Sequence, residues 1–357
     1  MQRRIMRAAL LVAFSQLCAA SLVDSDRSVQ RDDALLQLDR KEDDMQRIIN
    51  GAVVEDSVEK YSFFAMPVSA SNQKSWLGCG ASIISPTAAI SAAHCYGGGH
   101  NACSEHQKLS LMLGEMTLAD GEVQRKGSGK HFLIPEVHRT CHTNFDGKCS
   151  HGHDIVLLRF DKQLPSWVEP VILNLTHKPE HDQDRSVTAI GFGDTEGSAP
   201  DEVGDISPLL REATLTMQSM SADACQKVFL GGWGCSDEAS EAAGTNVEQQ
   251  VCAWSDDLKD TCAGDSGSAL LDHRTGSQIG ITSYGGGPGV VTKGPGRSCG
   301  DKNFPGLYSR VSSFKDFICE HVKDLPAASK SQCAEHASSH VTSLQKIRDH
   351  GSVRREK

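Results

Sequence analysis

The chain has 357 residues, of which 38% are hydrophobic and 33 are glycine, a composition typical of a loop-rich globular fold. Its formal net charge is −10 and it contains no dense stripe of lysine and arginine, which argues against nucleic acid as a partner. The 13 cysteines include no CxxC pair, so a structural zinc site is not indicated.

Residues 1–20 predict a secretory signal peptide, because arginines precede an apolar stretch that ends in the small residues Cys18-Ala19-Ala20. The alternative is a membrane anchor, but this apolar run is shorter than the roughly 20 residues that a spanning helix needs. We therefore expect a secreted, extracellular protein without a membrane segment. Loss of Cys18 leaves 12 cysteines in an oxidising compartment, which indicates disulfides.

Residues 21–47 resemble a detachable pro-segment, since they are highly charged, contain no cysteine and end at Arg47. The chain then becomes apolar at Ile48. A new N-terminal amine at Ile48 is buried at low cost only if a carboxylate meets it, and Asp265 is the candidate. The alternative is an ordinary linker before a strand.

Short apolar runs alternate with glycine, serine and proline from 62 to 93, which predicts antiparallel strands and hairpins. His94 follows, in the sequence SAAHC, and is the candidate general base. A single histidine after an apolar strand is more often structural, so this assignment needs partners elsewhere in the chain.

Asp154 opens the apolar run DIVLLRF and is the candidate acid that orients His94. A carboxylate beside a buried strand is costly unless it accepts a hydrogen bond, and an imidazole N–H would supply one. The alternative is an aspartate that caps a turn at the strand end. The loop before it carries four histidines, which form either a zinc site or a solvated polar loop: His138, His142, His151 and His153.

Residues 161–186 connect two halves and contain the one N-x-S/T sequon, at Asn174, a candidate glycosylation site. A second set of short strands follows, and apolar residues at helical spacing predict a helix over 311–322. The polar tail, 324–357, has no assignable chemical role, although Cys333 suggests a disulfide that holds its first part.

The sequence KDTCAGDSGS at 259–268 contains the candidate nucleophile, Ser266. Gly264 and Gly267 allow a sharp turn there, which can aim backbone amides at an oxygen next to the hydroxyl. A serine hydroxyl is nearly inert at neutral pH, so this role requires a histidine base and an orienting acid. His94 and Asp154 are those candidates.

With SAAHC, DIVLL, GDSGS and an R-IING start in this order, the chain resembles the trypsin-like (chymotrypsin-family) serine proteases over residues 48–323. The resemblance implies an all-β fold of two packed antiparallel six-stranded β-barrels with a C-terminal α-helix. The N-barrel would span about 48–165, the C-barrel about 180–310 and the helix 311–322.

The resemblance also implies the catalytic roles. Ser266 attacks the scissile carbonyl, His94 transfers the proton and Asp154 holds the imidazole tautomer. The amides of Gly264 and Ser266 form the oxyanion hole. Cleavage after Arg47 would free the Ile48 amine to pair with Asp265.

Substrate preference is implied by Asp260, six residues before Ser266, where family members that cleave after arginine or lysine carry an acid at the base of the S1 pocket. The alternative is a solvated loop acid like its neighbours Asp256 and Asp257. The other implied substrate-binding residues are Thr261, Ser283, Tyr284, Gly285, Gly306 and Tyr308. Thr261 and Tyr284 depart from the usual serine and tryptophan, which bears on preference rather than mechanism.

Three disulfides are implied by matching positions: Cys79–Cys95, Cys225–Cys252 and Cys262–Cys299. Among the remaining six cysteines, Cys141–Cys149, Cys319–Cys333 and Cys103–Cys235 is one of several pairings. The family's calcium loop is matched by Glu115 and Glu122 but not at its third acid, where Arg125 stands, so we expect no metal, and no cofactor either.

These features predict a secreted serine endopeptidase that is made as a zymogen and cleaves after arginine or lysine. Its partners would be protein or peptide substrates and protein protease inhibitors, and we expect a monomer. A non-catalytic homologue that serves as a binding module is the alternative, disfavoured because all three triad residues are present. A serine esterase of another fold would carry its serine before the acid and the histidine, which is not the order here.

Overall fold

The computed structural model describes residues 48–97, 108–126, 129–195, 206–226, 246, 248–285, 299–303 and 305–334. Its strands are β1 (Ala52–Val53), β2 (Phe64–Ser69), β3 (Ala81–Ser85), β4 (Ala88–Ser91), β5 (Leu109–Gly114), β6 (Met116–Ala119), β7 (Glu122–Arg125), β8 (His131–Cys141), β9 (Val156–Arg159), β10 (Ser186–Gly191), β11 (Arg211–Gln218), β12 (Gln250–Trp254), β13 (Ala269–Asp272), β14 (Gln278–Tyr284) and β15 (Gly306–Arg310). The helices are α2 (Ser57–Lys60), α3 (Asp223–Gln226) and α4 (Lys315–His321), with 3-10 turns η1 (Ala93–Tyr96), η3 (Cys149–His151), η4 (Pro179–His181) and η5 (Val311–Phe314).

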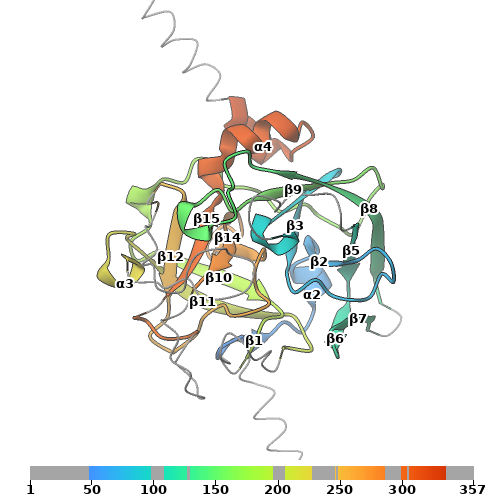
Figure 1. Cartoon of the computed structure of the whole chain (residues 1–357), viewed down its shortest axis with the longest axis horizontal. Coiled ribbons are helices and arrows are strands. Elements are labelled where there is room, and N and C mark those ends of the chain that lie inside the picture. Colours follow the sequence, from blue (N-terminus) through green and yellow to red (C-terminus); the bar gives the residue numbers. More distant parts are fainter. Residues whose placement is uncertain are drawn as a thin grey trace, which may run out of the picture. The chain divides into compact units, whose positions relative to one another are not determined.

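The first barrel closes in the order β2-β3-β4-β9-β8-β5, and every neighbouring pair is antiparallel (Figure 1). Five of its strands have four to six residues, β8 has eleven, and all five residues of β3 are buried. Closure leaves no free strand edge in the barrel, so the loops are what remain to carry chemistry.

The second barrel contains β10 to β15 and closes through a pairing between β11 and β12, with β1 added on β11. The predicted fold of two six-stranded antiparallel barrels is therefore confirmed. One predicted boundary differs. The sequence places residues 48–53 in the first barrel. In the structure, Ile48 is fully buried in the core of the second barrel and β1 pairs with β11. The apolar residues at the start of this segment are buried by packing against the second barrel.

The predicted helix over 311–322 is a 3-10 turn, η5, followed by α4. Phe314 and Ile318 are buried and join the core cluster that includes the first barrel. Residues 327–334, predicted as part of a polar tail, are also helical. Among the described residues, no helix is long and apolar enough to cross a bilayer.

The helical segment 327–334 is docked on the connection between the barrels through two side chains. The first is Ser329, whose Oγ atom accepts from the Leu173 amide at 2.9 Å. The Oε1 atom of Gln332 accepts from the Leu175 amide at 2.7 Å, and its Nε2 donates to the Leu173 carbonyl at 3.1 Å. The Gln332 side chain thus forms hydrogen bonds of the kind that a neighbouring strand would form with this stretch of backbone. The Cys319–Cys333 disulfide ties the same segment to α4.

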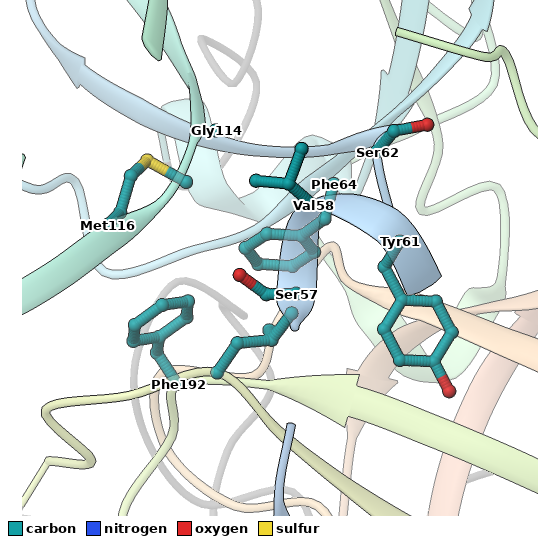
Figure 2. A pocket seen from close by; sticks show the side chains of 9 residues that line it. Ser57, Val58, Tyr61, Ser62, Phe64, Gly114, Met116 and Phe192 are labelled. Carbon is teal, nitrogen blue, oxygen red and sulfur yellow. The ribbon is translucent and has the colours of Figure 1, made fainter. Parts of the chain in front are cut away.

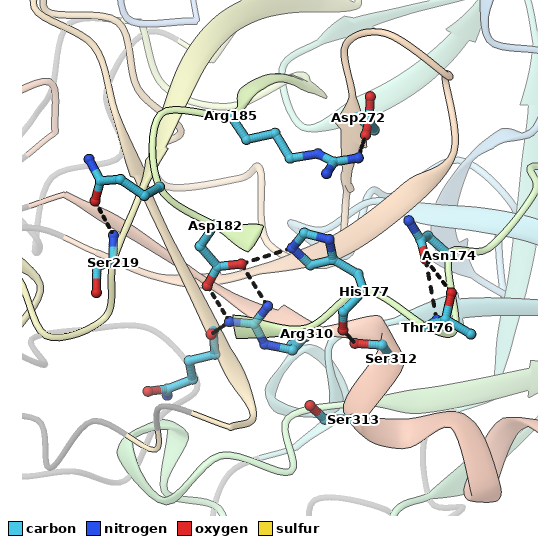
Figure 3. Close-up of polar contacts among 12 residues, drawn as sticks. Asn174, Thr176, His177, Asp182, Arg185, Ser219, Asp272, Arg310, Ser312 and Ser313 are labelled. Carbon is cyan, nitrogen blue, oxygen red and sulfur yellow. Dashed lines mark hydrogen bonds and ion pairs between the residues drawn. The ribbon is translucent and has the colours of Figure 1, made fainter. Parts of the chain in front are cut away.

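A buried ionic network anchors the end of β15 (Figure 3). Arg310, which is fully buried, pairs with both carboxylate oxygens of Asp182 at 2.9 and 2.5 Å and donates to the Gln250 carbonyl at 2.6 Å. His177 contacts the same carboxylate at 2.8 Å. Because both charges are paired and hydrogen-bonded, burial is tolerated here, and the connection between the barrels is fixed to β15.

A small cavity lies where the two barrels meet (Figure 2). Phe64 of the first barrel and Phe192, just after β10, stack there with ring centroids 5.8 Å apart. None of the residues predicted for the functional site lines this cavity. The lining residues are Ser57, Val58, Tyr61, Ser62, Phe64, Gly114, Met116, Phe192 and Leu210.

Candidate active site

His94 and Asp154, which are 60 residues apart in sequence, form a buried pair. Nδ1 of His94 lies 2.7 Å from Oδ2 of Asp154, and the His94 amide donates to Oδ1 at 2.9 Å. His94 lies in η1 and Asp154 lies two residues before the start of β9, which pairs with β4. With Nδ1 facing a carboxylate, the ring carries its proton there and Nε2 is left as the base.

The second barrel also holds Asp154. Ser283 at the end of β14 donates its hydroxyl to Oδ2 at 2.5 Å, and Ser309 of β15 donates to the Asp154 carbonyl at 2.8 Å. Burial alone would raise the pKa of Asp154, but its charge interaction and hydrogen bonds with His94, and the bond from Ser283, hold that pKa below the usual value. The carboxylate is therefore ionised at neutral pH.

Ser266 lies in a turn just before β13, and backbone hydrogen bonds join this turn to Gly80 and to β14. The Gly80 amide donates to the Ser266 carbonyl at 2.8 Å, and the Gly267 amide donates to the Thr282 carbonyl, also at 2.8 Å. Within the described part of the chain, the Ser266 hydroxyl forms no hydrogen bond, and the amides of Gly264 and Ser266 donate to no acceptor. These two amides are thus unengaged beside a candidate nucleophile.

Glycine is required at 264 by both conformation and space. Its φ is +96°, a region that side chains disfavour, and a Cβ atom there would lie 2.7 Å from Cη2 of Trp76. The turn that presents the two amides is therefore specified by this residue.

Asp260, predicted as the acid of the S1 pocket, is buried. Its carboxylate accepts from the amides of Thr261 at 2.8 Å and Gly300 at 3.0 Å, and no cation pairs with it among the described residues. Burial raises the pKa of Asp260 to about 7, partly opposed by these two amides. A desolvated acid of this kind favours a guanidinium or ammonium group that reaches it.

The other predicted pocket residues gather around Asp260. A Cβ at Gly306 would lie 2.9 Å from Oδ1 of Asp260 and 2.9 Å from the Tyr308 hydroxyl, and a Cβ at Gly285 would lie 3.1 Å from the Gly306 Cα. The Tyr308 hydroxyl is 3.0 Å from that of Thr261. Only glycine at these positions leaves the space above Asp260 open.

Tyr284 and Ser283 complete the predicted substrate-binding set at the end of β14. The Tyr284 hydroxyl accepts from Nε2 of Gln250 at 2.9 Å, and the Ser283 hydroxyl is engaged by Asp154. Because both hydroxyls are already hydrogen-bonded, these residues would contact a substrate through their backbone atoms and through the ring of Tyr284.

Asp265 is fully buried next to Ser266. Its carboxylate accepts from the amides of Gly193 at 2.7 Å and Cys262 at 2.9 Å, and burial raises its pKa to about 7. A Cβ at Gly191 would come 2.0 Å from its Oδ1, so small residues make room for this acid. Of the predicted activation residues, Ile48 is buried and Arg47 lies outside the described residues.

The predicted disulfides Cys79–Cys95, Cys225–Cys252 and Cys262–Cys299 are confirmed, as is Cys319–Cys333. Cys141 and Cys149 are also disulfide-bonded, but their pairing stays a prediction. Cys103 and Cys235 lie outside the described residues.

The predicted zinc alternative receives no support from the described histidines. His142 and His153 stack with ring centroids 4.8 Å apart, while His151 pairs with Asp146 at 2.7 Å. Among the described residues, one group of metal-type side chains is Cys79, His94 and Cys95, and another is His94, Cys149 and Asp154. The cysteines in both groups are disulfide-bonded. The stacked histidines have their pKa values lowered by burial.

Asn174 is half-buried between the buried residues Leu173 and Leu175. Its Oδ1 accepts from the Thr176 amide at 3.2 Å (Figure 3), which leaves Nδ2 without a hydrogen-bond partner in the described part of the chain. The side-chain nitrogen that a glycan would modify is therefore not engaged internally.

The family model described as Trypsin matches residues 52–318. Phenoloxidase-activating factor 1 of Holotrichia diomphalia is 28% identical over 76% of this chain and 69% of that protein. The CLIP domain-containing serine protease HP8 of Bombyx mori is 27% identical over 67% of the chain, which spans only 60% of that relative's length.

A solved structure, neuropsin, a serine protease expressed in the limbic system of mouse brain, superposes with a TM-score of 0.51. It is 23% identical, and the match covers 73% of this chain and 94% of neuropsin. This likeness supports the fold.

Proposed function

Because the chain belongs to the trypsin family of serine proteases, we propose that it is a serine endopeptidase that hydrolyses peptide bonds after arginine or lysine. The observation that carries this proposal is the buried His94–Asp154 pair, held by both barrels, beside a serine turn with two unengaged amides. Such a constellation suits acyl transfer through a covalent intermediate.

In the proposed reaction, the Ser266 oxygen bonds to the scissile carbonyl carbon while Nε2 of His94 takes the hydroxyl proton. Asp154 stabilises the imidazolium that forms. The carbon–nitrogen bond then breaks as His94 returns the proton to the leaving amine, and water cleaves the acyl-enzyme by the same steps. A hydrogen bond from Ser266 to His94 would form when substrate binds, since catalytic hydrogen bonds often reach good geometry only in the substrate complex.

The amides of Gly264 and Ser266 would stabilise the oxyanion of each tetrahedral intermediate. Removing one such donor typically raises the barrier by roughly 2.7 to 4 kcal/mol. Asp260 would bind the P1 cation, with Gly285 and Gly306 leaving room for its long side chain. The buried carboxylate, which pairs with no cation among the residues that the structure describes, supports this preference.

We propose activation by cleavage after Arg47. The new amine of Ile48 would give Asp265 a cationic partner, which no residue in the described part of the chain supplies. The pairing would order the pocket and the oxyanion turn. The burial of Ile48 in the second barrel and the position of Asp265 next to Ser266 support this scheme. Since Arg47 is itself a P1 residue of the proposed kind, the protein could activate itself.

Replacement of Arg47 tests this activation. We predict that Arg47→Gln protein is not processed by trypsin at this position and stays inactive, because no amine reaches Asp265. N-terminal sequencing and a peptide assay measure both effects, with Arg47→Lys as the control that is still cleaved. Full activity of intact Arg47→Gln protein would refute the scheme.

Secretion as a monomer, a glycan at Asn174, and protein substrates and inhibitors as partners are further parts of the proposal. The relatives named as proteases support action on proteins. A non-catalytic binding module is the alternative, and the intact His94, Asp154 and Ser266 set disfavours it.

The proposed activity is tested on protein cut after Arg47. We expect a fluorophosphonate probe to label wild-type protein at Ser266, and peptides with arginine or lysine at P1 to be cleaved far faster than peptides with glutamine. Ser266→Ala is the matched control and should neither react nor cleave. Absence of labelling in the cut wild type would favour the binding module.

A further inference from the structure

The side chain of Gln250, the first residue of β12, is buried, and each of its polar atoms is hydrogen-bonded. Its Nε2 atom donates to the Cys149 carbonyl at 3.2 Å and to the Tyr284 hydroxyl at 2.9 Å. Its Oε1 atom accepts from the Asn246 amide at 3.1 Å. Because a buried amide that loses a partner is costly, these contacts fix the orientation of the side chain.

Cys149, which accepts one of these bonds, packs against the candidate catalytic pair. It is fully buried in η3, and its Sγ atom, a ring nitrogen of His94 and a carboxylate oxygen of Asp154 all lie within 4.8 Å of one another. The Cys149 carbonyl also accepts from the Gly152 amide at 3.0 Å. The bond from Gln250 therefore fixes the turn that leads to Asp154, and a shift of this turn would move atoms close to the catalytic pair.

Tyr284, which accepts the other bond, lies next to the pocket proposed for the P1 side chain. It ends β14 and is half-buried, so part of the residue is accessible. Gly285 follows it, and a Cβ at Gly285 would lie 3.1 Å from the Gly306 Cα in the wall of that pocket. A peptide with its P1 side chain in the pocket therefore passes Tyr284. The tyrosine ring cannot swing away without breaking its bond to Gln250.

We propose that Gln250 is a positioning residue for the reaction, because its single amide nitrogen fixes both the Tyr284 ring beside the substrate and the Cys149 turn beside the catalytic pair. This inference rests on the proposed protease activity. Each bond should affect a different kinetic constant. Loss of the Tyr284 bond frees a surface that binds the substrate, which raises KM. Loss of the Cys149 bond loosens the geometry of the catalytic pair, which lowers kcat.

The experiment uses protein cut after Arg47 and two nitroanilide substrates, one of blocked arginine alone and one of a blocked tripeptide that ends in arginine. Gln250→Met fills a similar volume and forms neither bond. Gln250→Glu keeps the shape, and its carboxylate accepts from the Tyr284 hydroxyl but cannot donate to the Cys149 carbonyl. Tyr284→Phe removes the bond from Gln250 to Tyr284 and leaves the one to Cys149. Glu248→Gln, an exposed change in the same segment, is the matched control.

We expect Gln250→Met to lower kcat about tenfold on both substrates and to raise KM for the tripeptide, as the loss of buried hydrogen bonds should. Gln250→Glu should recover the KM for the tripeptide but not kcat, and Tyr284→Phe should reproduce only the rise in KM. Combining Gln250→Met with Tyr284→Phe should raise KM no further than Gln250→Met alone, since both changes break the same bond. Glu248→Gln should match wild type. Labelling with the fluorophosphonate probe gives the concentration of active sites, which corrects for misfolded protein.

Two results would overturn the inference. Unchanged kcat and KM per labelled site in Gln250→Met would mean that Gln250 serves only the fold. Equal losses in both constants for Gln250→Met and Gln250→Glu would mean that the amide does not act through two separate bonds. If cut wild type cleaves neither substrate, the proposed activity itself fails, which is a distinguishable outcome.

Discussion

The carboxylate of Asp260 links substrate preference to pH. It is buried, accepts two backbone amides and has no cationic partner among the described residues, so a P1 guanidinium or ammonium would supply its counter-charge. Only the ionised carboxylate offers that attraction. The affinity of the empty pocket for cations should therefore be proportional to the ionised fraction of Asp260.

We predict that benzamidine binding to the cut protein weakens about tenfold for each pH unit below 7, because burial raises the pKa of Asp260 to about 7 and protonation removes its charge. Above that pH the affinity should level off. Calorimetric titration from pH 5 to 8 measures it, and Asp260→Asn should bind weakly at every pH. A constant affinity across this range would contradict the prediction.

The sequence predicted the roles of some site residues and not those of others. His94, Asp154 and Ser266 stand in local motifs, so their types and neighbours predicted a common site. The hydroxyl of Ser309, which donates to the Asp154 carbonyl, belongs to no motif, since that contact depends on the packing of β15 against residues 155 positions earlier. Gln250 was missed for the same reason, because only the packing of β12 places its amide between Cys149 and Tyr284.

Among the elements, short apolar runs separated by glycine, serine and proline predicted the strands. Apolar residues at helical spacing predicted the last helix. The sequence could not assign Ile48 and β1 to the second barrel, because strand partners far apart in sequence are set by packing. Residues 327–334 looked like polar tail for a related reason. Their docking rests on the side chains of Gln332 and Ser329, which form hydrogen bonds with the backbone of Leu173 and Leu175.

Removal of that glutamine is a test at the scale of one element. We predict that Gln332→Ala lowers the free energy of unfolding by about 1 to 3 kcal/mol, because the buried Leu175 amide loses its acceptor. Urea denaturation at an unchanged m value measures it. Lys330→Ala, an exposed change in the same helix, should be neutral, and equal stability of the two variants would rule out the bridging role.

For the whole molecule, two buried acids set how stability depends on pH. In the uncut chain, burial raises the pKa values of Asp260 and Asp265 to about 7, above the ordinary value of 3.8. Each acid binds its proton more tightly when folded, so its contribution is fully present below the ordinary value and is lost as pH rises through about 7. Asp154 and Asp182, whose pKa values are lowered, act in the opposite direction at acidic pH.

We predict that the melting temperature of uncut Arg47→Gln protein falls more steeply from pH 5 to 8 than that of the cut wild type, in which the Ile48 amine would pair with Asp265 under the proposed activation. Each kcal/mol corresponds to about 2 to 4 °C for a domain of this size. Calorimetry at a series of pH values provides the comparison. Asp265→Asn in the uncut background should flatten the curve, and parallel curves for cut and uncut protein would count against the pairing.

The two hydroxyls that reach Asp154 from the second barrel have a consequence for biosynthesis. His94 and Asp154 emerge from the ribosome well before Ser266, and Ser309 follows later still, while the connection between the barrels is fixed by Arg310 only at the end of β15. On the proposed roles, a chain that stops before residue 310 carries an acid and a base without a completed site. Such a truncated product would lack both the Ser309 bond to the Asp154 backbone and the ion pair that fixes the connection between the barrels to β15.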